Sequence, residues 1–322
     1  MRNTAFVYHP VFLKHQTGWT HPEKRQRLTA ILDQLKKSGL WEQLIHLEPS
    51  PAPIEAITRI HTPAYVESLR LACEAGGLFE PDDSTVGSPG TYEAALMAAG
   101  GVLSALDAVM SGHAQNAFCA VRPPGHHAMP DRAMGFCFFN NVAIGARYLQ
   151  HRHGIRKVAI IDWDVHHGNG TQHAFYNDPS VFYFSLHQYP LYPHGGRACE
   201  TGEGEGKGYT LNVPMPAGAT DADYRRVFSQ DLKPALDWFQ PEFILISAGF
   251  DGHRDDPLAS LCLTEQGFAE LTQMVVTMAA EYCGNRLISV LEGGYHLPAL
   301  AASVEAHIRA LKYPKDGGGS GS

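Results

Sequence analysis

The stretch at residues 157–170, Lys-Val-Ala-Ile-Ile-Asp-Trp-Asp-Val-His-His-Gly-Asn-Gly, constrains this chain more than any other. Its apolar, β-branched first half is typical of a strand that is buried on both faces of a parallel sheet. Side chains of an extended chain alternate between two sides, so Asp162, Asp164 and His166 point the same way where the strand ends. Burying two carboxylates together without a cation is costly. The stretch therefore predicts a metal site, in preference to helix-capping aspartates and surface histidines.

Other predicted strands also run directly into polar residues. We expect strands at residues 117–121, 158–161, 181–186, 243–247 and 287–291. The segments at their ends read Arg-Pro-Pro-Gly-His-His (122–127), Asp-Trp-Asp-Val-His-His (162–167), Ser-Leu-His (185–187), Ser-Ala-Gly-Phe-Asp (247–251) and Leu-Glu-Gly-Gly-Tyr (291–295). Open α/β sheets bind ligands beyond the carboxyl ends of their strands. We expect these five segments to converge on one site.

Helical patterns separate most of these strands, and this alternation predicts an α/β fold in which helices cover both faces of a mostly parallel sheet. The chain begins with a predicted strand at 5–8 and a helix with a buried stripe at residues 28, 31, 32 and 35 that ends before Gly39. Further helices are predicted at 56–60, 63–75, 92–110, 221–239 and 265–282. Gly100 and Gly101 inside the long helix indicate close packing against a neighbour. We expect one domain over residues 1–314 and a Gly/Ser linker tail at 315–322.

Composition excludes several classes of function. The 322 residues are 44% hydrophobic and carry a net charge of -8, without a block of Lys and Arg, so we expect no direct nucleic-acid partner. The six cysteines form no Cys-x-x-Cys pair and are expected to be reduced packing residues. Neither an apolar leader nor a run of eighteen apolar residues occurs, which favours a cytoplasmic protein without a membrane partner. The oligomeric state is not determined by the sequence, and a homo-oligomer is possible.

Asp164, His166 and Asp251 are the best candidates for three metal ligands. Such a set leaves coordination positions open for water and substrate, as catalytic zinc requires. Its oxygen-rich donors do not choose sharply among Zn²⁺, Fe²⁺ and Mn²⁺.

Acid–base chemistry is assigned to His126 and His127, which follow a rigid Pro-Pro-Gly turn. A metal lowers the pKa of bound water toward about 7, and a neighbouring imidazole can accept its proton. Asp162 and Asn169 are candidates for orienting the two rings. Two further histidines, His15 and His21, could line the rim of a cleft or lie in solvent, and solvent is favoured for most of the histidines in this loop.

Tyr295 follows the flexible Gly293-Gly294 and offers a phenol that can stabilise an oxyanion, an effect of about 3 kcal/mol. Phe136 and Tyr192 could form the apolar walls of a channel for an extended acyl-amine chain. Together these residues predict metal-dependent hydrolysis of an amide.

The motifs closely resemble those of the histone deacetylase superfamily, and most of all its class II members and bacterial relatives. The matching segments are Arg-Pro-Pro-Gly-His-His-Ala, Gly-Phe-Cys-Phe-Phe-Asn-Asn-Val-Ala, Asp-Trp-Asp-Val-His-His-Gly-Asn-Gly-Thr-Gln, Ser-Ala-Gly-Phe-Asp and Leu-Glu-Gly-Gly-Tyr, in the family's order. The resemblance covers essentially the whole chain and implies an arginase/deacetylase-like fold.

The resemblance implies zinc on Asp164, His166 and Asp251, with His127 as the likelier general base and acid beside His126. Tyr295 would polarise the scissile carbonyl, while Gly135 and Phe136 line the acyl channel and Tyr192 forms its opposite wall. Class I enzymes carry Asp where this chain has Asn169, so a neutral amide would orient His127 here. The resemblance also implies two structural potassium ions. The matching positions are Asp162, Asp164, His166, Ser185 and Leu186 for one ion, and Phe175, Asp178, Val181 and Tyr209 for the other.

Relatives also bear on the substrate. Polyamine-selective relatives place an acidic residue where this chain has Leu258, which favours acyl-lysine here, and Asp83 matches a rim aspartate that holds the substrate backbone. The main alternative is an acetylpolyamine or other small-amide amidohydrolase. A binuclear manganese ureohydrolase resembles the chain less, because His253 stands where its second carboxylate is expected. A non-catalytic acyl-binding protein is disfavoured because the phenol and all three ligands are present.

Overall fold

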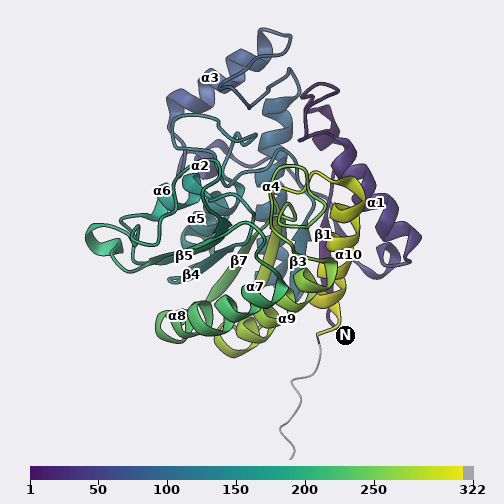
Figure 1. Ribbon diagram of the computed structural model, residues 1–322. Helices are drawn as coiled ribbons and strands as arrows, with labels where there is room; N and C mark the ends of the chain where they lie inside the picture. Colours follow the sequence, from purple (N-terminus) through teal and green to yellow (C-terminus); the bar gives the residue numbers. More distant parts are fainter. Residues whose placement is uncertain (315–322) are drawn as a thin grey trace, which may run out of the picture.

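A parallel sheet of eight strands runs through residues 1–314, which are the residues that the computed structural model describes (Figure 1). The strand order is β2-β1-β3-β8-β7-β4-β5-β6, and every neighbouring pair is parallel. The strands are β1 (Thr4–Val7), β2 (Ile45–Leu47), β3 (Asn116–Cys119), β4 (Val158–Asp162), β5 (Val181–Gln188), β6 (Thr210–Met215), β7 (Phe243–Ala248) and β8 (Leu287–Leu291). The predicted α/β class is confirmed.

Helices cover both faces of the sheet (Figure 1). One layer contains α2 (Ile54–Ile57), α3 (Pro63–Glu74), α4 (Thr91–Met110), α5 (Asn141–His153) and α6 (Asn169–Phe175). The other contains α1 (Gln26–Lys37), α7 (Asp221–Val227), α8 (Lys233–Phe239), α9 (Glu265–Tyr282) and α10 (Leu297–Lys312). Shorter helical turns are η1 (Pro10–Lys14), η2 (Trp41–Gln43), η3 (Gly204–Gly206) and η4 (Phe228–Leu232).

The long helix α4 is a buried core helix. By length and composition it could span a membrane, but 72% of its apolar window is buried inside the structure. A Cβ added to Gly100 would lie 1.8 Å from the carbonyl oxygen of Ser50, and one added to Gly101 would lie 2.8 Å from Val7 Cγ1. The close packing expected at this glycine pair is therefore confirmed.

Two details of the chain differ from the expectations. The single helix predicted at 221–239 is interrupted by the π-helical turn η4, because Pro234 has no N–H to donate to the preceding turn. The capping box of Thr220 and Asp223 at its start is present. The strands β2 and β6 are absent from the predicted set; β2 has three residues, and β6 contains Pro214, which an edge strand tolerates. The tail predicted at 315–322 lies outside the described residues.

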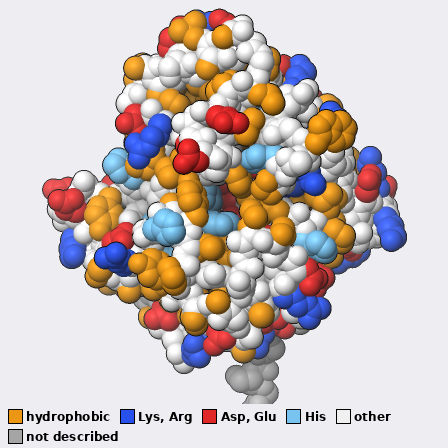
Figure 2. All heavy atoms as spheres, turned by 45° about the horizontal axis from the view of Figure 1, so that its top comes forward, with side chains coloured by type: hydrophobic (Ala, Val, Ile, Leu, Met, Phe, Trp, Pro, Cys, Tyr) orange, Lys and Arg blue, Asp and Glu red, His pale blue; other side chains and the backbone are white. Residues whose placement is uncertain are grey.

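The five predicted strands that run into polar segments, β3, β8, β7, β4 and β5, are consecutive neighbours in the sheet. Because all are parallel, their carboxyl ends meet at one edge, and Asp162 at the end of β4 lies in register with Ser185 and Ser247 on the two adjacent strands. The first strand begins near the lower end of the molecule in Figure 1, so this edge faces upward. Figure 2 looks toward it and shows a hollow among hydrophobic side chains and histidines.

Candidate metal centre and active site

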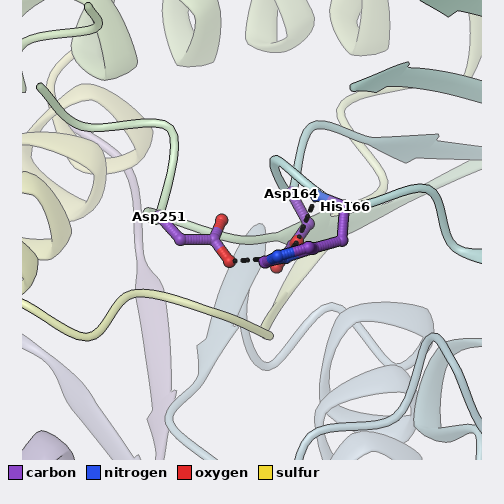
Figure 3. Close-up of side chains that lie close together, drawn as sticks. All are labelled: Asp164, His166 and Asp251. Atoms are coloured by element: carbon purple, nitrogen blue, oxygen red, sulfur yellow. Dashed lines mark hydrogen bonds and ion pairs between the residues drawn. The ribbon is translucent and has the colours of Figure 1, made fainter. Parts of the chain in front are cut away.

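Three predicted ligands meet beyond the ends of β4 and β7. Asp164, His166 and Asp251 are buried, and their ligand atoms all lie within 4.8 Å of one another. Nδ1 of His166 is 3.1 Å from Oδ1 of Asp164 and 3.2 Å from Oδ2 of Asp251. Figure 3 shows the three side chains turned toward one another. In residues 1–314 no other group of three His, Cys, Asp or Glu side chains has this spacing.

Backbone amides hold the two carboxylates in place. The amide of Gly293 donates to Oδ2 of Asp164 at 2.8 Å, and that of Val165 donates to Oδ1 of Asp251 at 3.0 Å. A Cβ added to Gly293 would lie 2.0 Å from Oδ2 of Asp251 and 2.6 Å from Oδ2 of Asp164. Glycine is therefore needed at this position, because a side chain would fill the space between the carboxylates.

The electrostatics of the centre fit a divalent cation. Burial raises the pKa of Asp251, and the charge of Asp164 raises it further. Burial lowers the pKa of His166, but hydrogen bonds to both carboxylates outweigh it and raise the pKa to about 10. Two acidic groups thus impose a strongly negative potential that a bound cation would offset. The donor set of two carboxylates and one imidazole suits such an ion.

The two predicted acid–base histidines lie next to this centre with different partners. Nδ1 of His126 is 3.1 Å from Oδ2 of Asp162, and Nδ1 of His127 is 2.8 Å from Oδ1 of Asn169. Burial lowers the pKa of His127 well below its usual value, and the charges of His126 and His166 lower it further. His127 is therefore neutral and able to accept a proton.

A cavity of about 210 Å³ opens above the centre. Besides His127 and His166, its predicted lining residues are Gly135, Phe136, Tyr192, Leu258 and Tyr295, and the structure places all of them in the wall. Ser84 and Leu191 also line the cavity and were not predicted. Asp83 is exposed on the turn beside Ser84, outside the lining.

The segment that carries Tyr295 is held by two residues that the sequence reasoning missed. The carboxylate of Asp256 accepts a hydrogen bond from the backbone amide of Tyr295 at 2.6 Å. Nε of Arg27 donates a hydrogen bond to the carbonyl of Gly294 at 2.7 Å. The Arg27 guanidinium also lies 5.0 Å from the centre of the Tyr295 ring. Burial, and then the charge of Asp251, raises the pKa of Tyr295 well above its usual value, so the phenol stays protonated as a donor.

The expectation that His15 and His21 lie in solvent is wrong. The His15 ring is buried, with Nδ1 2.7 Å from the hydroxyl of Thr91. The His21 ring is half-buried, and its centre lies 4.7 Å from that of Phe136 in the cavity wall. Both are covered because the loop after β1 folds back over the carboxyl edge of the sheet.

The residues of the predicted potassium sites lie in two places. Asp162, Ser185 and Leu186 are on the adjacent strands β4 and β5, next to the metal ligands. The second set surrounds the start of β5 and consists of Phe175, Asp178, Val181 and Tyr209. The two potassium ions stay a prediction. His253 is buried and turned toward the amide of Asp255 and the carboxylate of Glu265.

Comparison with known proteins agrees with this geometry. The histone deacetylase domain family matches residues 21–311. A protein named "probable deacetylase" from Archaeoglobus fulgidus is 42% identical over 324 residues, covering 97% of this chain and 89% of the relative. The human polyamine deacetylase HDAC10 is 40% identical over 96% of this chain, which spans 48% of that protein. The crystal structure of the HDA15 HD domain superposes with a TM-score of 0.92 at 35% identity, covering 98% of this chain and 90% of that one. The chain therefore belongs to the histone deacetylase family and is a hydrolase of that type.

Proposed function

We propose that this protein hydrolyses the amide of N-acyl-lysine in peptides or proteins, with Zn²⁺ held by Asp164, His166 and Asp251. Fe²⁺ and Mn²⁺ suit the same donors. When bound, the ion supplies a Lewis acid and an activated water. The buried, mutually close ligand atoms support this proposal most directly.

The surrounding side chains then handle protons and charge. His127 donates through Nδ1 to Asn169, which leaves Nε2 free to take a proton from the attacking water and to return it to the departing amine. The phenol of Tyr295 donates to the carbonyl oxygen as negative charge develops there. Burial lowers the pKa of His126, but Asp164 and Asp162 outweigh it and raise the pKa to about 10. The hydrogen bond to Asp162 orients the His126 ring beside the reaction.

The walls of the cavity favour an acyl-lysine chain. Its described lining residues include no carboxylate, and Leu258 is apolar. A cationic polyamine chain would gain from a carboxylate in the wall, whereas the uncharged methylene stem of lysine gains from apolar and aromatic walls. The rings of Phe136 and Tyr192 provide such walls.

The alternative substrate is an acetylpolyamine or another small amide. The similarity to the human polyamine deacetylase HDAC10 supports it. The exposed carboxylate of Asp83, beside the rim residue Ser84, instead suits a peptide, whose backbone amides it would accept hydrogen bonds from.

A substrate panel on purified, metal-analysed protein separates these proposals. We expect kcat/KM for an acetyl-lysine peptide to exceed that for acetylputrescine and acetylspermidine by about tenfold or more, since a tenfold preference needs only 1.4 kcal/mol. A preference for the polyamines would establish the alternative. Two metal ions per chain at the catalytic centre would instead indicate a binuclear enzyme, and no hydrolysis of any amide would refute the proposal.

We also propose that K⁺ occupies the two predicted sets of residues and that the protein works in the cytoplasm. Thermal unfolding in KCl and in choline chloride at equal ionic strength tests the ion. K⁺ should raise Tm if it binds only the folded state. Equal values of Tm in the two salts would contradict the proposal that K⁺ binds.

A further inference from the structure

The side-chain amide of Asn169 has different partners at its two ends. Its oxygen accepts a hydrogen bond from Nδ1–H of His127 at 2.8 Å. Its nitrogen donates to two thioethers, Sδ of Met134 at 3.2 Å and Sδ of Met129 at 3.4 Å. The NH₂ group has two N–H donors, and each sulfur is an acceptor. Every polar atom of this amide is therefore engaged.

The two sulfurs select one of the two orientations of this amide. If the amide of Asn169 turned over, its oxygen would face two sulfurs that have no hydrogen to donate. Its NH₂ group would then face the ring nitrogen of His127. A carboxylate at this position would have no such choice, because both of its oxygens accept.

The orientation of Asn169 determines which nitrogen of His127 carries the proton. With the oxygen facing it, Nδ1 is the protonated nitrogen and Nε2 keeps its lone pair. With the amide reversed, Nδ1 would accept from NH₂, and the proton would move to Nε2. Nε2 could then no longer act as a base toward a substrate in the cavity that His127 lines.

We propose that Met129 and Met134 are positioning residues, which hold Asn169 with its carbonyl toward His127 and thereby keep Nε2 of His127 basic. The catalytic consequence rests on the proposed function, in which His127 is the general base. Both methionines are half-buried and lie in the segment between the histidine pair and Phe136. The same segment thus supplies the base, the residues that fix its tautomer, and a wall of the channel.

Kinetics in two backgrounds distinguish this role from simple packing. With Asn169 present, the double variant Met129→Leu/Met134→Leu should lower kcat about tenfold. This is a part of the roughly 10²–10⁴-fold rate enhancement that a general base contributes. KM should stay within about twofold, because substrate contacts are retained. In an Asn169→Asp background the same double change should cost nothing further, since a carboxylate needs no orientation. Equal losses in both backgrounds would show that the methionines only fill space.

A tautomer measurement gives a readout that does not depend on turnover. We would record ¹⁵N spectra of histidine-labelled, metal-loaded protein and assign His127 with His127→Gln. Nδ1 should be protonated in the natural sequence and in Asn169→Asp, while the double leucine variant should show a mixture of tautomers. An unchanged tautomer in that variant would overturn the proposal, even if no substrate were ever found. Conversely, the predicted spectra without any hydrolysis would refute only the proposed function.

A matched control uses a methionine away from the site. Met278 is buried in α9, and Met278→Leu makes the same change of side chain within the core. It should leave kcat and the His127 tautomer as they are, since Met-to-Leu exchanges cost under about 1.5 kcal/mol of stability. Metal content and Tm of all variants confirm that folding and loading are retained. A Met278→Leu loss equal to that of the double variant would also point to packing.

Discussion

Two buried charged clusters contact the segment at residues 292–295. The metal centre contacts it through the amide of Gly293, which donates to Asp164. The second, which we call the arginine cluster, consists of His15, Glu23, Arg27 and Arg122, all of them buried. Arg27 donates to the carbonyls of Glu292 and Gly294. Both clusters are buried, but cationic groups are in excess in the arginine cluster and carboxylates are in excess at the metal centre.

In the arginine cluster the carboxylate of Glu23 pairs with two guanidinium groups. Oε1 of Glu23 accepts from Arg122 at 2.5 Å and from Arg27 at 3.2 Å. Burial raises the pKa of Glu23, but Arg122, His15 and Arg27 outweigh it and hold the pKa well below its usual value. At the metal centre, by contrast, burial and Asp164 raise the pKa of Asp251. The arginine cluster has two guanidinium groups for one carboxylate, whereas the metal centre has two carboxylates for one imidazole. Only the metal centre therefore carries an excess of buried negative charge that a bound cation would offset.

The sharpest difference should appear on removing one carboxylate of the metal centre. Asp251→Asn removes a ligand, so we expect loss of bound metal and at least about a 1,000-fold fall in kcat. In metal-free protein the free energy of unfolding should not decrease, because the change relieves repulsion from Asp164. Metal analysis, kinetics and urea unfolding of the chelator-treated protein measure the three quantities. Marked destabilisation of the metal-free variant would mean that Asp251 is a structural residue.

The same kind of change in the arginine cluster should instead destabilise the fold. Glu23→Gln leaves Arg27 and Arg122 without their buried counter-charge, and breaking such a pair costs about 3–5 kcal/mol of unfolding free energy. Glu93→Gln is the matched control, because Glu93 pairs with Lys14 at the surface, where a salt bridge is worth about 0–1 kcal/mol. Urea unfolding compares them. Equal effects of the two substitutions would break the distinction drawn between the clusters.

Tyr295, which lies between the clusters, should affect turnover and leave stability unchanged. Tyr295→Phe removes only the hydroxyl and keeps the backbone contact with Asp256. We expect the activation free energy to rise by about 3 kcal/mol, so that kcat falls roughly 100-fold or more. Metal content should be unchanged, and Tm should move by less than about 2 °C. Unchanged turnover in this variant would remove the phenol from the mechanism.

The metal centre could be predicted from the sequence because its residues stand directly after buried strands. Parallel strands bring their carboxyl ends to one edge, so Asp164, His166 and Asp251 had to approach one another once the strands were recognised. The partners of the histidine pair followed from the same segments, and Asp162 and Asn169 contact the expected rings. The local sequence pattern and the parallel sheet topology together were enough to predict the metal ligands and the partners of the histidine pair.

The arginine cluster could not be predicted in the same way. Glu23 and Arg122 are 99 positions apart, and no local pattern marks them as partners. Charged residues are normally exposed, so sequence reasoning put His15 in solvent and left Arg27 unassigned. Their burial depends on how the loop after β1 packs over the sheet, which is a tertiary property. The thioethers at Met129 and Met134 were missed for the same reason, since methionine carries no chemical signature in a motif.

A pH dependence of stability gives the finest test of the arginine cluster. Burial, and then Arg122, lowers the pKa of His15 to about 4, compared with 6.5 in an unfolded chain. Between these values the unfolded chain binds a proton that the folded protein does not, so the unfolding free energy falls as pH drops from 6.5 to 4. One such group contributes a slope of about 1.4 kcal/mol per pH unit. His15→Gln should reduce the slope by this amount, as measured by urea unfolding at several pH values.

His113→Gln, on the exposed turn after α4, is the control and should leave the slope unchanged. An equal slope in His15→Gln and the natural sequence would show that the cluster does not hold His15 neutral.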